Sequence, residues 1–416
     1  MDNQPKKSLH KRYWWAIVTL IVIAVSISCY YRWSKNEACP YACCVSAKWQ
    51  EKICADGLYC SNNACLKNKE VRVNGPDFIF DKTKYNFIGA FTFPTLTHLV
   101  YYPDWSLDNF SSNEEAIDEY LNSLIDMNIE VIRFFGFGQY EIEIQKNGNV
   151  VNFEEPNWSR LDYLLEECEK RGLKIIFNLW DYWDYQEAGA IQKRYEYWQD
   201  TRIKQVITKI VNRYKTSPAI FAWEIINEGD CLGLRDEADR IQIYSWIKEI
   251  SAFIKTIDSN HLVSTGFTGE ALRESYFNEY NDQDKYPAIR QFLLELYQLP
   301  SLDYLSFHAY GGNIDKMTDS SYYNIEWKKQ MAWYIDETFK IGQEVGKPIL
   351  HEEWGVMKEV GEPMRTEVYQ YMLYLYAQNK ICNLFNGWGD DEANMMIFKG
   401  DNETGVISQA ITLWNN

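Results

Sequence analysis

Histidine and basic residues are scarce in this 416-residue chain. Its histidines form no HxH or HExxH spacing, which argues against a catalytic zinc site, and we expect neither a metal nor a cofactor. Lysine and arginine together number 42 against 59 acidic residues, so the formal net charge is −17. Such a chain lacks the clustered positive charge that nucleic acid binding requires, and a neutral polymer suits it better as a partner.

Aromatic residues, by contrast, are abundant. The chain holds 16 tryptophans and 30 tyrosines. We expect most of them to pack in a core and the others to form a surface that stacks on flat ligands. The length suits one large α/β barrel with an appendage.

One apolar run near the N-terminus is long enough to cross a bilayer. Residues 13–31 contain no charge over 19 positions, and four basic side chains precede them in residues 1–12. This pattern predicts a cytoplasmic basic tail and a transmembrane signal anchor, with the bulk of the chain outside the cell membrane. The alternative is a cleaved signal peptide, which would make the protein secreted; the run is long for that, and no A-x-A site follows it.

Six cysteines follow the apolar run within 27 residues, at positions 39, 43, 44, 54, 60 and 65. Such density after an export segment predicts a small disulfide module over residues 36–66, with fifteen possible pairings. Among the later cysteines, Cys168 and Cys382 are expected to be core thiols. Cys231 is placed to brace a neighbouring loop through a disulfide.

The remaining chain, residues 70–416, alternates short β-rich runs with helical patterns. A hairpin is expected over 71–80, turning at Asn74-Gly75, and Ser112 is expected to cap a helix. Eight runs are typical of strands, and their ends recur at intervals of roughly 35 to 48 residues, near Phe91, Phe135, Leu179, Asn227, Gly266, His308, Glu353 and Trp388. This alternation predicts a (β/α)8 TIM barrel, in which active sites gather at the C-terminal strand ends.

Two of these strand ends carry glutamates. The run PAIFAWEIINEGD ends in Asn227 and Glu228, and KPILHEEWG ends in Glu352 and Glu353. The fourth and seventh strands lie roughly opposite each other, which suits one carboxyl on each side of a glycosidic bond, with Glu228 as acid/base and Glu353 as nucleophile. Adjacent strand residues face opposite ways, so only one of Glu352 and Glu353 can enter the mouth. Glu224 is expected deeper, as a buried structural carboxylate.

Other residues at the strand ends suit the same chemistry. Arg133 is placed to hold the nucleophile ionised, and Tyr310 to donate a hydrogen bond to it. Asn227 can hydrogen-bond a sugar hydroxyl, and His308 can orient the groups beside it. Trp388 offers a flat apolar floor for a pyranose ring.

From about residue 70 to the C-terminus the chain resembles glycoside hydrolase family 5, particularly its endo-β-1,4-mannanases. The matching pieces occur in the family's order: VRVNGPDFIFDKTKYNFIGAF, VIRFFGF, FNLWDYWDYQEAG, SPAIFAWEIINE, DSNHLVSTGFTGE, LDYLSFHAY and KPILHEEWG. The resemblance implies a retaining mechanism, with Glu228 as acid/base and with Glu353, rather than Glu352, as nucleophile. It implies substrate contacts for Trp180, which looks like part of the mannanases' tryptophan–aspartate loop, and for the matching positions Arg133, Asn227, His308, Tyr310 and Trp388.

The chain departs from the family after the acid/base. The family commonly has asparagine–glutamate–proline, whereas Gly229 and Asp230 follow Glu228 here, and we expect them to loosen this loop. We therefore expect a hydrolase of β-1,4-linked polysaccharide, mannan first, and a β-1,4-glucanase as the alternative. A non-catalytic carbohydrate-binding surface protein is the alternative from another class; it would have lost a carboxylate or Arg133.

Overall fold

The computed structural model describes residues 58–61, 64–67, 70–101, 110–136, 155–180, 201–311, 317–387 and 401–414. The chain divides into two compact units, residues 1–69 and 70–416. In the first unit, β1 (Leu58–Ser61) and β2 (Ala64–Lys67) form an antiparallel hairpin. No helix among the described residues combines the length and the apolar character needed to cross a membrane. The anchor predicted at 13–31, and most of the cysteine module, lie outside the described residues.

The second unit is built on eight parallel strands, in the spatial order β10-β9-β8-β7-β6-β13-β12-β11. They are β6 (Ile88–Phe91), β7 (Val131–Phe135), β8 (Lys174–Asn178), β9 (Ile220–Glu224), β10 (Leu262–Ser264), β11 (Leu305–His308), β12 (Ile349–Trp354) and β13 (Cys382–Asn386). Backbone hydrogen bonds also join the two ends of this order. Asp303 N, just before β11, donates to Val263 O in β10 (2.8 Å), and His308 N in β11 donates to Thr268 O, just after β10 (3.0 Å). The sheet therefore closes on itself, and the predicted barrel is confirmed.

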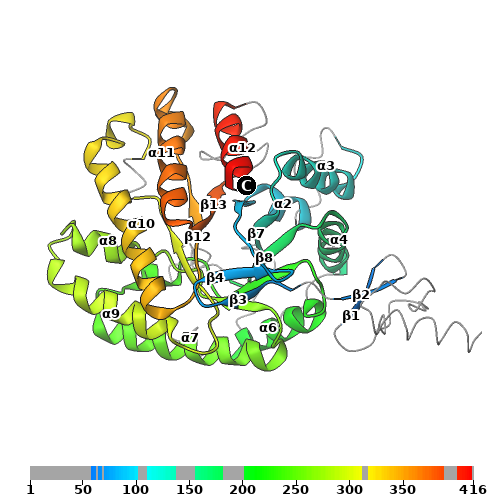
Figure 1. Ribbon diagram of the computed structural model, residues 1–416. Helices are drawn as coiled ribbons and strands as arrows, with labels where there is room; N and C mark the ends of the chain where they lie inside the picture. The colour runs from blue at the N-terminus through cyan, green and yellow to red at the C-terminus, as the bar shows by residue number, and fades with distance from the viewer. Residues whose placement is uncertain are drawn as a thin grey trace, which may run out of the picture. The chain divides into compact units, whose positions relative to one another are not determined.

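Helices surround the strands (Figure 1). They are α2 (Thr95–Tyr101), α3 (Asn113–Asp126), α4 (Glu155–Arg171), α6 (Thr201–Tyr214), α7 (Glu237–Ile257), α8 (Glu270–Tyr276), α9 (Tyr286–Tyr297), α10 (Ile325–Val345), α11 (Met364–Asn379) and α12 (Asn402–Trp414). The Oγ of Ser112 accepts a hydrogen bond from Glu115 N, so the predicted cap of α3 is confirmed. The sequence did not predict α2 and α8, because seven residues are too few to establish a helical period.

The predicted N-terminal hairpin closes the end of the barrel at which the strands begin. β3 (Arg72–Asn74) and β4 (Asp77–Phe80) pair across Gly75, whose φ of +57° suits the turn. Phe78 enters the barrel and packs edge-on against Phe221 and Tyr304. The apolar residues pointing inward at this level form their own cluster, so the lower barrel is a packed core.

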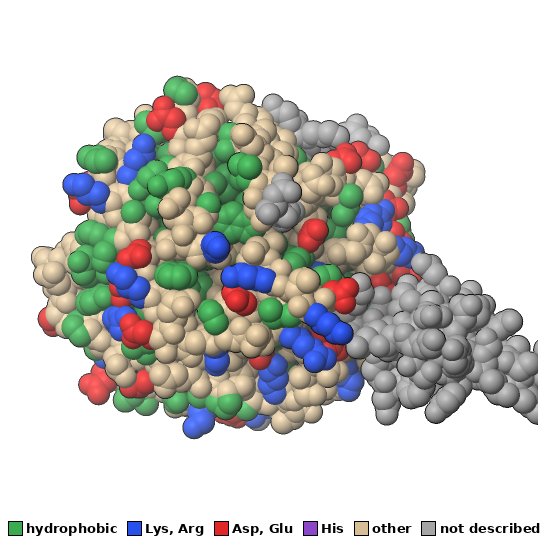
Figure 2. Space-filling model, viewed as in Figure 1, with side chains coloured by type: hydrophobic (Ala, Val, Ile, Leu, Met, Phe, Trp, Pro, Cys, Tyr) green, Lys and Arg blue, Asp and Glu red, His purple; other side chains and the backbone are tan. Residues whose placement is uncertain are grey.

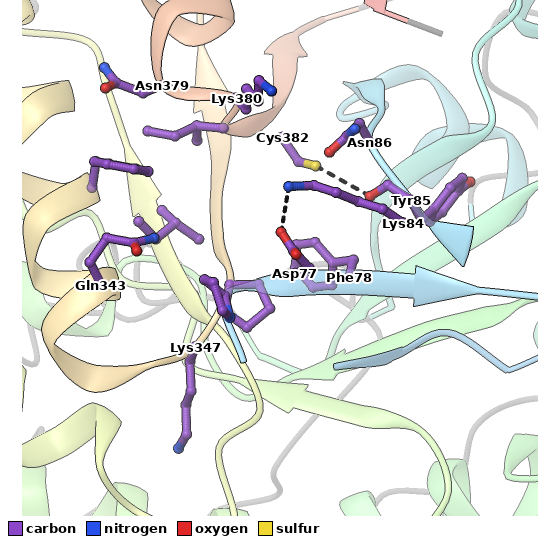
Figure 3. Close-up of a pocket in the computed structure, with 15 residues that line it drawn as sticks. Asp77, Phe78, Lys84, Tyr85, Asn86, Gln343, Lys347, Asn379, Lys380 and Cys382 are labelled. Atoms are coloured by element: carbon purple, nitrogen blue, oxygen red, sulfur yellow. Dashed lines mark hydrogen bonds and ion pairs between the residues drawn. The ribbon is translucent and has the colours of Figure 1, made fainter. Parts of the chain in front are cut away.

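A small pocket lies beside this hairpin, at the start of β12 and β13 (Figure 3). Its volume of about 30 Å³ leaves room for about two water molecules. Lys84 and Asp77 form an ion pair at 2.5 Å on one side, and the thiol of Cys382 lies 3.8 Å from Tyr85 O. This pocket is at the opposite end of the strands from the predicted active site.

The three cysteines of the barrel whose side chains the structure describes are free thiols: Cys168, Cys231 and Cys382. Cys168 and Cys382 are buried, as predicted. The disulfide predicted at Cys231 is wrong; its Sγ lies 3.9 Å from a carboxylate oxygen of Glu228. On the face shown in Figure 2, acidic and basic side chains lie interspersed, with hydrophobic side chains between them.

Candidate active site

Six of the predicted site residues meet at the C-terminal ends of the strands. Arg133 comes from β7, the Asn227–Glu228 pair follows β9, and His308 ends β11. The other two are Tyr310, just after β11, and Glu353, within β12. Arg133, His308 and Glu353 are buried because every residue of their strands is buried, whereas Tyr310, outside the strands, is half-buried.

Arg133 holds the cluster together, with a side chain that is fully buried. Its Nη1 contacts Oε1 of Glu353, while its Nε donates to Oε2 of Glu224 across 2.7 Å and its Nη2 contacts the other oxygen of the same carboxylate. Nη2 also donates to Oδ1 of Asn227 at 2.8 Å. Glu224 is thus the buried carboxylate that the sequence predicted, and Arg133 is its partner. A guanidinium shared between two carboxylates compensates charges that would be costly to bury alone.

Glu228 is oriented by an unusual backbone conformation. Its φ of 55° and ψ of 27° lie in the left-handed region, which is rare for a residue with a side chain. Its N–H donates to Gly266 O at 2.7 Å, which ties this turn to the end of β10. Its Oε1 lies 2.8 Å from Nδ1 of His308. Strained conformations of this kind cluster at functional sites, where the surrounding structure enforces them.

Glu353 is nearly buried, and both of its carboxylate oxygens have partners. Oε1 contacts Arg133, and Oε2 accepts a hydrogen bond from the hydroxyl of Tyr310 at 2.6 Å. Burial raises the pKa of Glu353, and repulsion from Glu228 adds to this, while Arg133, Tyr310 and the protonated form of His308 oppose the shift. The predicted support of the ionised form by Arg133 is therefore present, but burial outweighs it.

The two candidate carboxyls are close. One oxygen each of Glu228 and Glu353 and one ring nitrogen of His308 all lie within 4.8 Å of one another. Retaining glycosidases place their carboxyls about 5–5.5 Å apart, whereas inverting enzymes need about 6.5–9.5 Å. The same three groups are also close enough to ligate a metal ion. Because Arg133 and Tyr310 already engage both oxygens of Glu353, the arrangement suits acid–base and nucleophilic work better.

The structure resolves the choice between the adjacent glutamates of β12. Glu352 points into the barrel interior, where its Oε1 accepts a hydrogen bond from Tyr304 at 2.9 Å. Its side chain is fully buried, and burial followed by the proximity of Glu224 raises its pKa well above the usual range. Glu353 takes the position at the mouth. This is the arrangement that the family resemblance implied.

Gly229 and Asp230 do not loosen the acid/base loop, contrary to expectation. The buried carboxylate of Asp230 accepts hydrogen bonds from Thr268 N (2.8 Å), Gly269 N (2.7 Å) and the Oγ1 of Thr268 (3.1 Å). It therefore joins the loop after β9 to the loop after β10. Burial raises the pKa of Asp230 to about 6.

The two tryptophans predicted to contact the substrate are not among the six residues that meet at the strand ends. Trp180 is 7 % exposed and belongs to the hydrophobic core, and its carbonyl accepts a hydrogen bond from Asn227 N at 2.6 Å. It positions the Asn227–Glu228 pair but offers little surface to a sugar. Trp388 lies outside the described residues.

Sequence reasoning missed two asparagines of the site. Asn178, the last residue of β8, donates to Oε1 of Glu224 at 2.5 Å. Asn386, the last residue of β13, donates to the hydroxyl oxygen of Tyr310, which in turn donates to Glu353. Both stand at strand ends, so the rule that found the other residues applied to them as well.

A closed barrel that presents two close carboxyls and a supporting arginine at its strand ends has the arrangement that glycoside hydrolysis requires. The family model described as cellulase (glycosyl hydrolase family 5) matches residues 85–392. The chain therefore belongs to glycosyl hydrolase family 5.

Sequence relatives agree with this assignment. The chain is 28% identical over 322 residues to mannan endo-1,4-beta-mannosidase F of Aspergillus fumigatus, covering 71% of this chain and 67% of that protein. It is 29% identical over 307 residues to mannan endo-1,4-beta-mannosidase A of Podospora anserina, covering 68% and 73%. For the probable mannosidase F of Aspergillus flavus, 30% identical, the match spans 59% of this chain and only 55% of the relative.

Two crystal structures show the same fold. The endo-1,4-beta-mannanase of Rhizomucor miehei superposes with a TM-score of 0.62 at 23% identity, covering 83% of this chain and 99% of that one. The endo-beta-1,4-mannanase of Thermotoga petrophila gives 0.61 at 23% identity, covering 80% and 78%.

Proposed function

We propose that this protein is a retaining β-1,4-mannanase, with Glu353 as nucleophile and Glu228 as general acid and base. The separation within 4.8 Å between oxygens of the two carboxyls carries the proposal, because it leaves no room for the water that an inverting enzyme places between them. Mannan is the favoured substrate because the sequence relatives described above are named mannan endo-1,4-beta-mannosidases.

The reaction proceeds in two displacements. Glu353 attacks the sugar's C1 while Glu228 gives its proton to the departing glycosidic oxygen, so the C1–O bond to the leaving chain breaks as the ester to Glu353 forms. Water then attacks C1, Glu228 takes a proton from it, and the ester bond to Glu353 breaks. Both carboxyls return to their starting states.

The neighbouring residues support these steps. Arg133 and Tyr310 hold the carboxylate of Glu353 by one oxygen each, which fixes its position relative to C1. Burial lowers the pKa of His308, so the imidazole stays neutral beside Glu228 and leaves the proton to that carboxyl. Trp388 is proposed as the floor under the reacting sugar.

The decisive experiment measures reducing ends released by the purified chain from galactomannan, glucomannan and carboxymethyl cellulose. We expect turnover of the two mannans. Because a retaining enzyme keeps the anomeric configuration, NMR at early times should show the β-anomer of the products. Glu353→Gln should abolish turnover, whereas Glu352→Gln, its matched control, should retain it. No turnover on any β-linked glycan would refute the proposal and favour the non-catalytic alternative.

A β-1,4-glucanase is the second candidate, favoured by the family model's description as cellulase. The same assay separates the two candidates, because a glucanase would degrade carboxymethyl cellulose faster than galactomannan.

We also propose that residues 13–31 anchor the enzyme in the cell membrane with the barrel outside. The uncharged run and the basic residues before it support this location. Sequencing the N-terminus of the mature protein tests it, since a start after about residue 30 would mean a cleaved signal and a secreted enzyme.

A further inference from the structure

One buried carboxyl beside the active site takes no part in the two proposed displacements. Asp230 lies in η3 (Gly229–Leu232), the short 3-10 helix that begins directly after Glu228. Its Oδ1 accepts a hydrogen bond from Thr268 N, and its Oδ2 accepts from Gly269 N and from Oγ1 of Thr268. An ionised carboxylate makes such hydrogen bonds about twice as strong as a neutral group does. Asp230 therefore binds the loop after β10 firmly.

Both ends of the segment from Glu228 to Asp230 are attached to that loop. At one end, Glu228 N donates to Gly266 O at 2.7 Å; at the other, the carboxylate of Asp230 binds Thr268 and Gly269. The left-handed backbone of Glu228 costs about 1–2 kcal/mol, so it persists only where the surroundings enforce it. The attachments on either side of Glu228 provide that enforcement.

Thr268 also holds the imidazole that Glu228 faces. Its carbonyl accepts hydrogen bonds from His308 N at 3.0 Å and from the hydroxyl of Tyr334 at 2.5 Å. Nδ1 of His308 in turn lies 2.8 Å from Oε1 of Glu228. The side chain of Asp230 therefore completes a closed ring of contacts, and without it the backbone of Glu228 could shift relative to the imidazole of His308.

Gly229 leaves the restraint of this turn to the side chain of Asp230. A Cβ at position 229 would stand 2.7 Å from Cγ2 of Ile226, so the turn packs best without a side chain there. The proline that commonly follows the acid/base in this family would restrain the backbone through its own ring. Glycine supplies no such restraint. In this chain, the hydrogen bonds of Asp230 take the place of the proline ring.

We propose that Asp230 is a positioning residue for the proposed general acid, because its hydrogen bonds to Thr268 and Gly269 fix the carboxyl of Glu228 where it can protonate the departing glycosidic oxygen. This inference rests on the proposed function, since it needs Glu228 to be the acid. A misplacement of about 1 Å can cost about 10²-fold in rate. Loss of Asp230 should therefore slow substrates whose leaving group needs a proton and spare those whose leaving group needs none.

The test compares two such substrates in variants of the full chain. Asp230→Ala should lower kcat/KM by about 10- to 100-fold for mannohexaose, whose leaving sugar needs a proton, but by less than about twofold for a dinitrophenyl mannobioside. The quantity compared is kcat/KM because it reports only the steps up to the first displacement. Asp230→Asn keeps the size and one acceptor oxygen, so it should change the ratio between the substrates in the same direction but less.

Asp258→Ala is the matched control. Asp258 is also buried and accepts backbone hydrogen bonds, from Asn260 N at 2.9 Å and His261 N at 3.2 Å. It lies at the end of α7, where β10 begins, which is the opposite end of the strands from Glu228. Its loss should destabilise the fold without changing the ratio of kcat/KM between the two substrates. Circular dichroism establishes that each variant is folded at the assay temperature.

The outcomes separate this inference from the proposed function. A wild type that cleaves neither substrate, or a Glu228→Ala variant that slows both equally, refutes the proposed role of Glu228, and the inference fails with it. If Glu228→Ala slows only mannohexaose, an unchanged ratio in Asp230→Ala overturns the role of Asp230 alone, and Asp230→Asn decides the question where the alanine variant does not fold. An equal change of the ratio in Asp258→Ala would also overturn that role, because general damage to the fold would then be enough to cause it.

Discussion

Nδ1 of His308 lies 2.8 Å from Oε1 of Glu228 and 3.8 Å from Oε2 of Glu353, so one imidazole faces both reacting carboxyls. Burial is the largest cause that lowers its pKa, and Arg133 adds to it. The neutral imidazole of His308 therefore lies beside both carboxyls without placing a charge between them. In the proposed mechanism, the proton that the reaction moves belongs to Glu228.

Removing that proton donor should affect substrates according to their leaving groups. Glu228→Ala should lower kcat on mannan by about 10²–10⁴-fold. A dinitrophenyl mannobioside, whose leaving group needs no proton, should still react with Glu353 and give a burst of dinitrophenolate. Added azide, which needs no general base, should then restore turnover. Equal losses on both substrates without azide rescue would contradict the acid/base role.

The two interior glutamates should respond differently to amide substitution. Glu224→Gln removes the charge that pairs with two nitrogens of Arg133, and leaving this buried cation under-compensated should cost about 3–5 kcal/mol of unfolding free energy. Glu352→Gln mimics a carboxyl that its raised pKa keeps protonated, and it should cost less than about 1.5 kcal/mol. Urea titrations measure both. Equal destabilisation would mean that Glu352 is ionised.

Alanine substitutions at two glycines distinguish the cost of backbone strain from damage to the active site. Gly266 and Gly346 have φ values of +81° and +75°. A Cβ at Gly346 would meet nothing within 4 Å, so Gly346→Ala should cost only the left-handed backbone strain of about 1–2 kcal/mol. A Cβ at Gly266 would stand 2.4 Å from Oε1 of Glu224. Gly266→Ala should therefore cost about 1–3 kcal/mol more in unfolding free energy than Gly346→Ala, and it should also lower the activity. An unchanged kcat in Gly266→Ala would contradict the idea that the contact with Glu224 supports the active site.

Acid should destabilise the fold through its buried histidines. Burial lowers the pKa of His351 to about 3, and its Nε2 lies 3.0 Å from Oγ1 of Thr338. The unfolded chain takes up this proton near pH 6.5 and the folded chain does not, so stability is lost as the pH falls from about 6.5 towards 3. Between pH 7 and pH 5, His351 alone should remove about 2 kcal/mol.

Urea midpoints at pH 7 and pH 5 test this prediction. His351→Gln should be less stable than the wild type at pH 7 but should lose less on acidification. The neutral His308 acts in the same direction and stays in both proteins, so it cancels in the comparison. The same loss in both proteins would show that His351 does not carry the effect.

The sequence by itself determined the barrel and most of the site, because both depend on local patterns. Short apolar runs that alternate with helical periods specify parallel strands, and residues at the ends of such strands must meet at one rim. Arg133, Asn227, Glu228, His308, Tyr310 and Glu353 were all found by that rule. The family resemblance added the preference for Glu353 over Glu352 as the nucleophile.

Only the tertiary structure showed in which direction certain side chains point and which residues, far apart in the sequence, they contact. The residues of the strand alone left open which of Glu352 and Glu353 enters the mouth; the structure turns Glu352 to Tyr304 and Glu353 to Tyr310, as the family resemblance implied. The sequence also could not predict that Arg133 pairs with Glu224 or that Asp230 binds the loop after β10. The position proposed for the proton donor, Glu228 just after β9, faces Glu353 only because the barrel closes and brings both to one rim.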